Sequence, residues 1–286
     1  MARIHAAGAL KPSSCRTVNA VLAIRKMRGG SQAHLLKCDD GSHYVVKFRN
    51  NPQHRRTLIN EWLAAEVLRA LDISAPRTAV VHLSEEFIVS NPALSIEIGC
   101  RMVGPVTGPH FGSCHPGHPE STAIYDFLPD AMLQRLENLH DFLGMLVVDK
   151  WLANADKRQC IFSRTRGRGA GPRSNGCGLV AHMIDHGYCF NGPHWNFVDS
   201  PLSGTYFRAI VYESVHCVDD FDWWLARIAE FPEHVLYQAV AAVPPDWIET
   251  DGGLLDSLLQ RLLRRRSLVP DLIQQTLKTD RFIACS

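Results

Sequence analysis

The chain has 286 residues, of which 46% are apolar and 21% are charged, and its formal net charge is +1. This balance is typical of a soluble globular protein, and the lack of a basic excess gives no reason to expect nucleic acid or an acidic membrane as a direct partner. The nine cysteines are odd in number and include no Cys-x-x-Cys pair, which disfavours a disulfide framework or a zinc ribbon. Without a run of about 18 apolar residues or a secretory leader, we expect a cytoplasmic protein with no membrane span.

The first third of the chain predicts a small β-rich region with one helix. Asp39-Asp40-Gly41 is a strong hairpin signal, because glycine accepts a positive φ at little cost. Apolar residues then switch to a period near 3.6, which predicts a helix that ends before Ser74-Ala75-Pro76. The expected strands are 18–24, 33–38, 42–48, 78–83 and 86–89, and the expected helix is 57–71.

The rest of the chain predicts mainly helices. Residues 91–130 are rich in Pro, Gly and His and are interpreted as an irregular connection. A long helix is expected over 133–153, and short strands over 160–162 and 179–184. The intervening loop, 163–178, carries four arginines and is flexible by composition. From residue 206 onward we expect helices interrupted by prolines.

Phosphoryl transfer requires a backbone cradle for phosphates, a lysine on their oxygens, metal ligands, and an acidic residue that orients the attacking hydroxyl. The candidate cradle is Gly29-Gly30-Ser31-Gln32, because glycines let backbone N–H groups approach an anion closely. A plain hairpin turn is the equally simple alternative.

Lys47 ends an apolar strand, between Val46 and Phe48, and a lysine in such surroundings needs an anionic partner. Glu61 on the following helix is the first candidate for that partner, and Glu66 is the second. The alternative is a lysine on an edge strand, pointing into water.

Two aspartates occupy positions that suit a catalytic cleft. Asp156 follows the long helix, and Asp185 ends a buried apolar strand, where a carboxylate is costly unless it pairs or binds a metal. Because they stand on either side of a hairpin, we expect both to face one cleft. Either aspartate alone has a simpler explanation, such as the capping of a turn. The two together are a much more specific sign of a catalytic cleft.

Three other groups of residues are candidates for binding a metal ion or nucleic acid. His182, His186 and Cys189 lie close together in sequence, but their spacing matches no zinc pattern. Cys114, His115 and His118 are separated by Pro and Gly, which favours a loop over a metal site. The segment 261–266 (RLLRRR) is interpreted as the solvated face of a helix, with a nucleic-acid patch as a minor alternative.

Four segments, HYVVKF, INEWLAAEVLRALDISAP, VVDKWLANAD and MIDHG, occur in an order that resembles the HipA-like kinases, over residues 20–195. The resemblance implies an α+β, two-lobed protein-kinase-like fold, with a small antiparallel β lobe that carries one helix (1–100) and a mainly α-helical large lobe (101–286). It also implies ATP and Mg²⁺ as cofactors. Lys47 would then contact the α- and β-phosphates with Glu61 as its helix partner, Asp156 would be the catalytic aspartate, and Asp185 would bind the metal.

The sequence departs from the family pattern in the catalytic loop. The expected asparagine five residues after Asp156 is Ile161, so Gln159, the nearest amide, is the candidate second metal ligand. The usual histidine is Arg158, whose guanidinium is expected to contact phosphate.

The predicted function is a Ser/Thr protein kinase acting on an unidentified protein, with Ser31 as the candidate autophosphorylation site. The alternatives are a pseudokinase that serves as a nucleotide-binding interaction module and a small-molecule or lipid phosphotransferase. Because the candidate phosphate loop comes so early in the sequence, we expect no extra N-terminal subdomain like that of the toxin-type members. A toxin role and an antitoxin-like partner are therefore not carried over.

Overall fold

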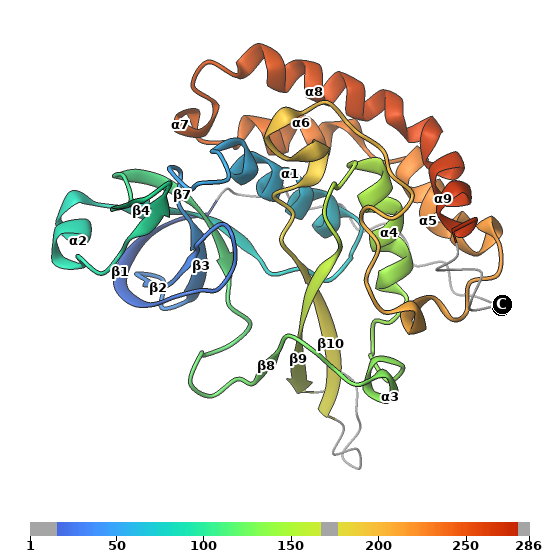
Figure 1. Cartoon of the computed structure of the whole chain (residues 1–286), viewed down its shortest axis with the longest axis horizontal. Coiled ribbons are helices and arrows are strands. Elements are labelled where there is room, and N and C mark those ends of the chain that lie inside the picture. Colours follow the sequence, from blue (N-terminus) through green and yellow to red (C-terminus); the bar gives the residue numbers. More distant parts are fainter. Residues whose placement is uncertain (1–15, 167–176, 280–286) are drawn as a thin grey trace.

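A closed five-stranded barrel forms the small lobe of the computed structural model, which describes residues 16–166 and 177–279 (Figure 1). Its strand order is β1-β2-β3-β7-β4, in which β1 and β4 are parallel and the other neighbours are antiparallel. The strands are β1 (Thr17–Lys26), β2 (His34–Cys38), β3 (His43–Lys47), β4 (Thr78–Leu83) and β7 (Gly108–Cys114).

The turn between β2 and β3 has the expected chemistry. Gly41 has a φ of +79°, and the Asp40 carboxylate accepts hydrogen bonds from the Ser42 backbone N–H (2.9 Å) and the Tyr44 hydroxyl (2.9 Å). This turn sets the register that pairs His34 with Val46. Lys47, one residue further along, is therefore the last residue of β3.

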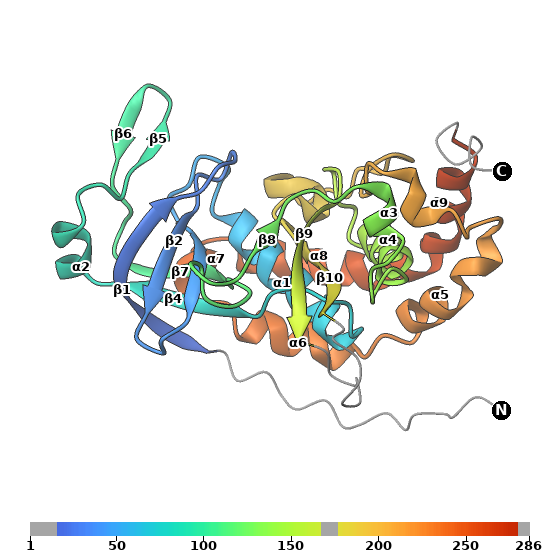
Figure 2. The ribbon, with the colours of Figure 1, turned by 90° about the horizontal axis from the view of Figure 1, so that it is seen from below.

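Two predictions for residues 84–130 were wrong. Residues 85–90 form a helix, α2 (Glu85–Ser90), because the Ser84 hydroxyl accepts a hydrogen bond from the Phe87 N–H and caps it. The segment 91–130 is not an irregular connection, since it contains β7, which lies between β3 and β4 in the barrel. It also contains β5 (Ile96–Ile98), β6 (Arg101–Val103) and β8 (Ile124–Tyr125), and the β5–β6 hairpin projects from the barrel in Figure 2.

The long helix predicted over 133–153 is shorter than expected. A short α3 (Asp130–Leu133) precedes it, and α4 (Asp141–Trp151) begins only at residue 141. The intervening residues run beside β10 instead, where the Glu137 N–H donates to the Leu179 carbonyl (3.0 Å) and the Asn138 amide donates to that of Ala181 (2.9 Å). Tertiary pairing has thus displaced the helix that the apolar spacing favoured.

The hairpin after α4 is longer than predicted. It consists of β9 (Gln159–Arg166) and β10 (Cys177–Ile184), paired in register from Gln159↔Ile184 to Arg166↔Cys177. The predicted flexible loop 163–178 is therefore partly strand, and its residues 167–176 lie outside the described part of the chain, as do residues 1–15, on which the expectation of no secretory leader rests.

Helices fill the large lobe (Figures 1 and 2). The last of them cover residues that the sequence predicted as helices broken by prolines. They are α5 (Asp222–Ala229), α6 (Glu233–Ala241), α7 (Pro245–Ile248), α8 (Gly252–Arg264) and α9 (Val269–Leu277), with short 3₁₀ turns at Cys189–His194, Ala209–Tyr212, Val218–Phe221 and Arg265–Leu268. Within the described residues, no helix is both long and apolar enough to cross a membrane.

The helix α1 (Arg56–Ala70) joins the two lobes. It is buried along most of its length, and its apolar residues belong to the core of the large lobe rather than to that of the barrel. The Trp62 indole donates to the Ala239 carbonyl (3.0 Å), and Arg56 binds the Asp251 carboxylate in the large lobe (2.6 and 2.8 Å). Because the barrel includes β7, we propose to place the lobe boundary after Cys114 rather than at residue 100.

Candidate active site

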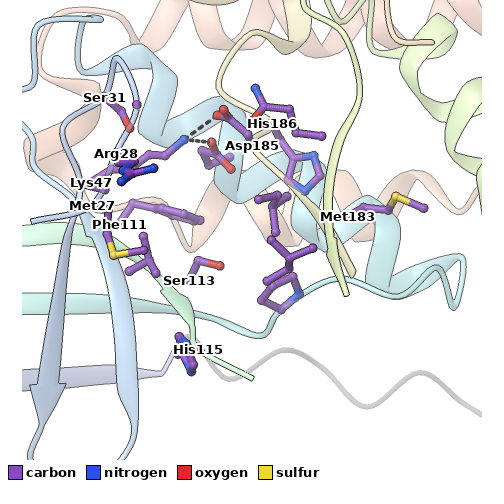
Figure 3. A pocket seen from close by; sticks show the side chains of 18 of the residues that line it. Met27, Arg28, Ser31, Lys47, Phe111, Ser113, His115, Met183, Asp185 and His186 are labelled. Carbon is purple, nitrogen blue, oxygen red and sulfur yellow. Dashed lines mark hydrogen bonds and ion pairs between the residues drawn. The ribbon is translucent and has the colours of Figure 1, made fainter. Parts of the chain in front are cut away.

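A cavity of about 760 Å³ lies between the barrel and the β9–β10 hairpin. It is lined by the turn after β1, the ends of β3 and β7, the loop before β9 and the residues that follow β10. Figure 3 shows Lys47, Asp185 and Ser31 at one end of this cavity, with Phe111 and Ser113 further along it. This volume is within the range of about 300–1,000 Å³ for small-molecule sites.

Lys47 is almost fully buried and lies between two carboxylates. Its ammonium group contacts Glu61 Oε1 and lies 2.8 Å from Asp185 Oδ1. Burial alone would lower the pKa of Lys47, but the attraction of the two carboxylates raises it above its ordinary value, so the ammonium stays charged. The expected contact with Glu61 is present, whereas Glu66, the second candidate, binds Arg69 (2.6 Å) on its own helix.

Glu61 is held in place because α1 is packed on all sides. The next residue toward its N-terminus, Asn60, donates through its amide to the carbonyls of Gly187 (2.7 Å), Cys189 (3.0 Å) and Gly192 (3.0 Å). Its amide oxygen accepts from the Trp195 indole (2.8 Å). One helix therefore positions both the partner of Lys47 and the backbone after Asp185, a role of Asn60 that no sequence motif indicated.

The glycine turn covers one end of the cavity. Gly29, Gly30 and Ser31 line it, and Gly29 has a φ of +117°, which side chains rarely tolerate. Gln32 does not fit the expected cradle. Its N–H closes the turn onto the Gly29 carbonyl (3.1 Å), and its side chain is bound by Lys26 (2.7 Å) and the Glu97 backbone (2.8 Å).

Asp156 lies on the large-lobe side of the cavity, in the loop between α4 and β9. Its backbone N–H donates to the Asn154 side chain (3.1 Å), its carbonyl accepts from the Gly204 N–H (2.8 Å), and its Oδ1 accepts from the Lys157 N–H (2.7 Å). The side chain is partly exposed to the cavity, so a hydroxyl group entering there can reach a carboxylate whose orientation is fixed by its own loop.

Asp185 and Gln159 lie at the same end of the β9–β10 hairpin. Gln159 pairs with Ile184, the residue before Asp185, and both side chains line the cavity. Asp185 has a φ of +60°, an uncommon conformation for a non-glycine residue that often occurs at functional sites. Burial opposes ionisation of this carboxyl, but Lys47 beside it lowers its pKa below the ordinary value, so Asp185 is an anion at neutral pH.

The expectation that Arg158 contacts phosphate was wrong. Its side chain is 1% exposed and does not line the cavity, so it is not placed to contact phosphate. The guanidinium instead forms two hydrogen bonds with the buried Asp149 carboxylate, at 2.5 and 2.9 Å. A buried guanidinium without a carboxylate would be costly, and Asp149, which sits on α4, supplies it.

The charges around Lys47 support the binding of a cation. Lys47 is shared by two carboxylates: burial raises the pKa of Glu61, whereas Lys47 lowers the pKa of Asp185 and keeps that carboxylate ionised. Asp185 is therefore the carboxylate that faces the cavity as an anion. Carboxylate and amide oxygens are the ligands that Mg²⁺ prefers, so Asp185 and Gln159 are chemically suited to hold Mg²⁺.

Several cavity residues were missed by the sequence analysis. Arg28, in the glycine turn, presents its guanidinium near Lys47 in Figure 3 and adds positive charge where phosphates would lie. Further along, apolar side chains suit a flat aromatic ring, and Ser113 adds a hydroxyl group. These apolar residues are Val45, Phe111, Ile124, Ile161 and Met183. They come from segments far apart in the sequence, so no local pattern could have grouped them.

The rival metal sites are not formed. Among residues 16–166 and 177–279, no group of three or more His, Cys, Asp or Glu side chains could hold a metal ion. His182 instead lies within hydrogen-bonding distance of the hydroxyls of Ser74 (3.0 Å) and Ser163 (2.8 Å). Arg265, expected on a solvated helix face, is buried against Asp199.

Comparison with known proteins gives one family and one fold. A family model described as HipA-like kinase matches residues 20–165. No curated protein sequence matches significantly.

Among solved structures, the chain is similar to the Golgi casein kinase (TM-score 0.53, 13% identity) and to the Golgi casein kinase with Mn/ADP bound (TM-score 0.50, 10% identity). Each alignment covers 94% of this chain and 74% of the other. A Helicobacter pylori proinflammatory kinase, CtkA, aligns over 92% of this chain and 98% of its own, with 13% identity and a TM-score of 0.49. At these identities the Golgi casein kinase structures give evidence on the fold alone. They confirm the expected two-lobed protein-kinase-like α+β fold.

Proposed function

The chain belongs to the HipA-like kinase family, and on this premise we propose that it transfers the γ-phosphoryl group of ATP to a serine or threonine hydroxyl of a protein. The observation that carries the proposal is the position of Lys47, held between Glu61 and Asp185 beneath the glycine turn of an open cavity. Phosphoryl transfer depends mainly on positioning and on stabilising negative charge, and this arrangement offers both.

In this proposal each group of residues has one task. Gly29, Gly30 and Ser31 cover the phosphates, Lys47 neutralises them, and Glu61 holds Lys47 extended. Mg²⁺, when bound by Asp185 and Gln159, would neutralise further phosphate charge. The apolar end of the cavity binds the adenine ring.

Asp156 orients the acceptor. Its partly exposed carboxylate accepts a hydrogen bond from the serine or threonine hydroxyl and takes up the proton as the oxygen attacks. Ser31 lies in the glycine turn and is our candidate for autophosphorylation. A phosphate there would repel the phosphates of ATP and lower its affinity.

A second candidate function is nucleotide binding without transfer. It is favoured by Ile161, an apolar residue that lines the cavity where the family pattern has a metal-binding asparagine. The two candidates differ in turnover, not in the binding of ATP.

The test is transfer of radiolabelled phosphate from ATP in the presence of Mg²⁺, with the protein itself and a general acceptor protein as substrates. Wild type is compared with Asp185→Asn, and with Asp271→Asn as a control, because Asp271 is exposed on α9. We expect label with wild type and the control, and none with Asp185→Asn. Equal labelling by all three would refute the site, while ATP binding without any label would favour the second candidate.

A further inference from the structure

Arg158 and Asp149 form a buried ion pair beneath the cavity that the proposed function does not use. Asp149 Oδ2 accepts from Arg158 Nε (2.9 Å) and Oδ1 accepts from Nη2 (2.5 Å), so the carboxylate fixes one edge of the planar guanidinium. Asp149 is itself fixed, since its Oδ1 also accepts from the Asn154 amide (2.9 Å). The direction of the remaining nitrogen of Arg158, Nη1, is therefore set by a rigid support.

Nη1 reaches the two residues on either side of Asp185. It donates to the Ile184 carbonyl (2.6 Å) and lies 3.1 Å from His186 Nδ1. Because a guanidinium only donates hydrogen bonds, Nδ1 of His186 must accept, and the ring carries its proton on Nε2. A single nitrogen thus binds the backbone before Asp185 and the side chain after it.

Asp185 needs such support because its backbone is strained. Its φ of +60° is unfavourable for a non-glycine residue and persists only where the surroundings enforce it. Ion pairing with Lys47 holds the end of the Asp185 side chain, but it does not fix the backbone. The two contacts of Nη1 act on the residues whose peptide groups flank the strained φ and ψ.

We propose that Arg158 is a positioning residue that holds Asp185 in the conformation needed to bind the metal of the nucleotide complex. The inference rests on the proposed function, because it assigns Asp185 to that metal. It also explains why arginine stands at this position. The planar guanidinium binds the Asp149 carboxylate along one edge and two further acceptors through Nη1. The ammonium of a lysine has a single nitrogen and cannot bind both sides at once.

The test measures metal binding rather than turnover. Binding of Mn²⁺ to the full chain with ADP is followed by electron paramagnetic resonance, and thermal unfolding of each variant is recorded alongside. Arg158→Lys keeps the buried charge and loses the fork. Arg265→Lys is the matched control, because Arg265 is also buried and binds one carboxylate, that of Asp199 (2.5 and 3.0 Å), and two backbone carbonyls. None of these partners lines the cavity.

Loss of an outer-shell partner typically weakens metal binding by about 10- to 100-fold. We expect Arg158→Lys to bind Mn²⁺ with ADP at least about 10-fold more weakly than wild type, and Arg265→Lys to bind within about 2-fold of it, even if both unfold at lower temperature. Should Arg158→Lys not fold, Asp149→Asn, which weakens the same fork, is measured in its place with the same expected result.

The outcomes separate this inference from the proposed function. Wild-type binding with equal affinity in the folded Arg158 or Asp149 variant overturns the positioning role alone. Equal weakening in the Arg265→Lys control also overturns it, because the effect would then follow from general destabilisation. Absence of Mn²⁺ and ADP binding in wild type overturns both the inference and the proposed metal site.

Discussion

Two clusters of charged side chains lie close to Asp185, and they differ in how completely their charges are matched. In the first, Lys47 faces Glu61 and Asp185, and the Asp185 side chain is 36% exposed to the cavity. In the second, Arg158 faces Asp149, and the two side chains are 1% and 0% exposed. In the first cluster one ammonium is shared by two carboxylates and the Asp185 side chain opens onto the cavity, whereas in the second one guanidinium faces one carboxylate and both are sealed from solvent.

This difference indicates that the open cluster can bind a ligand, whereas the sealed pair supports the backbone around Asp185. The sealed pair has no unmatched charge for a ligand to meet, so its effect on chemistry passes through the backbone it holds. In the open cluster the ionised Asp185 carboxylate lies beside the cavity, where its oxygens are suited to bind a metal ion. Type of residue alone does not reveal this, because each cluster pairs a basic side chain with aspartate or glutamate.

The largest effect is expected from breaking the sealed pair. Arg158→Met leaves the Asp149 carboxylate buried without a counter-charge, and we expect the free energy of unfolding to fall by about 3–5 kcal/mol in chemical denaturation. The double variant Arg158→Met with Asp149→Leu removes both charges and should recover most of this loss. A double variant no more stable than the single one would show that the pair contributes more than mutual neutralisation.

Breaking the open cluster should cost less and should respond to metal. Lys47→Met leaves Glu61 and Asp185 without their shared cation, and we expect a loss of about 3 kcal/mol, because Asp185 is partly exposed. Mg²⁺ should raise the unfolding temperature of Lys47→Met, since it supplies the missing charge, but should not raise that of Arg158→Met. If Mg²⁺ stabilised neither variant, or both equally, the contrast between the clusters would not hold.

A buried neutral group provides a third case, sensitive to pH. His110 accepts from the Arg49 N–H (2.9 Å), and its other ring nitrogen lies 2.9 Å from the Val106 carbonyl. Burial lowers the pKa of His110 to about 3, well below the 6.5 of an exposed histidine. Between these two pH values His110 is protonated in the unfolded chain but neutral in the folded chain. The free energy of unfolding therefore falls as the pH drops below 6.5.

From pH 7 to pH 5 this histidine should account for about 2 kcal/mol of lost unfolding free energy. The measurement is urea unfolding at both pH values for wild type, His110→Gln and the surface control His234→Gln. The loss between the two pH values should be smaller by about 2 kcal/mol in His110→Gln and unchanged in the control. A pH dependence identical in all three proteins would contradict the buried neutral state.

The sequence predicted most elements of the fold, but not those set by tertiary pairing. Turn chemistry and apolar periodicity placed β3 and α1 within about two residues of their ends. The strand β7 was missed because its sequence, GPHFGSC, carries no local strand signal and is fixed by pairing with β3 and β4. Residues 134–140 were assigned to a helix because the sequence pattern contains no information on their contact with β10.

In the candidate site, too, local sequence patterns identified residues but not their tertiary partners. Lys47, Asp156 and Asp185 were singled out because each stands at the end of an element with an apolar face, and the structure places all three around one cavity. Arg158 was assigned to phosphate because it stands where the family pattern has a histidine, and nothing in the sequence marked Asp149 as its partner. Burial of a polar pair depends on which faces of two elements meet, and no residue pattern along a single element specifies that.

The smallest effect distinguishes the two glycines of the turn. Gly29 has a φ of +117°, and no heavy atom lies within 4 Å of the position that an alanine Cβ would take, so Gly29→Ala is opposed by backbone strain alone. An alanine Cβ at Gly30 would lie 2.9 Å from Gln53 Nε2, the end of a flexible side chain that can move away.

Strain of roughly 1 kcal/mol or more in a turn that covers phosphates should weaken ATP binding by about 5-fold in Gly29→Ala. Gly30→Ala should remain within about 2-fold of wild type, because no positive φ is disturbed there. Calorimetric titration with ATP distinguishes the two, and equal affinities would mean that the turn does not need the conformation that only Gly29 supplies.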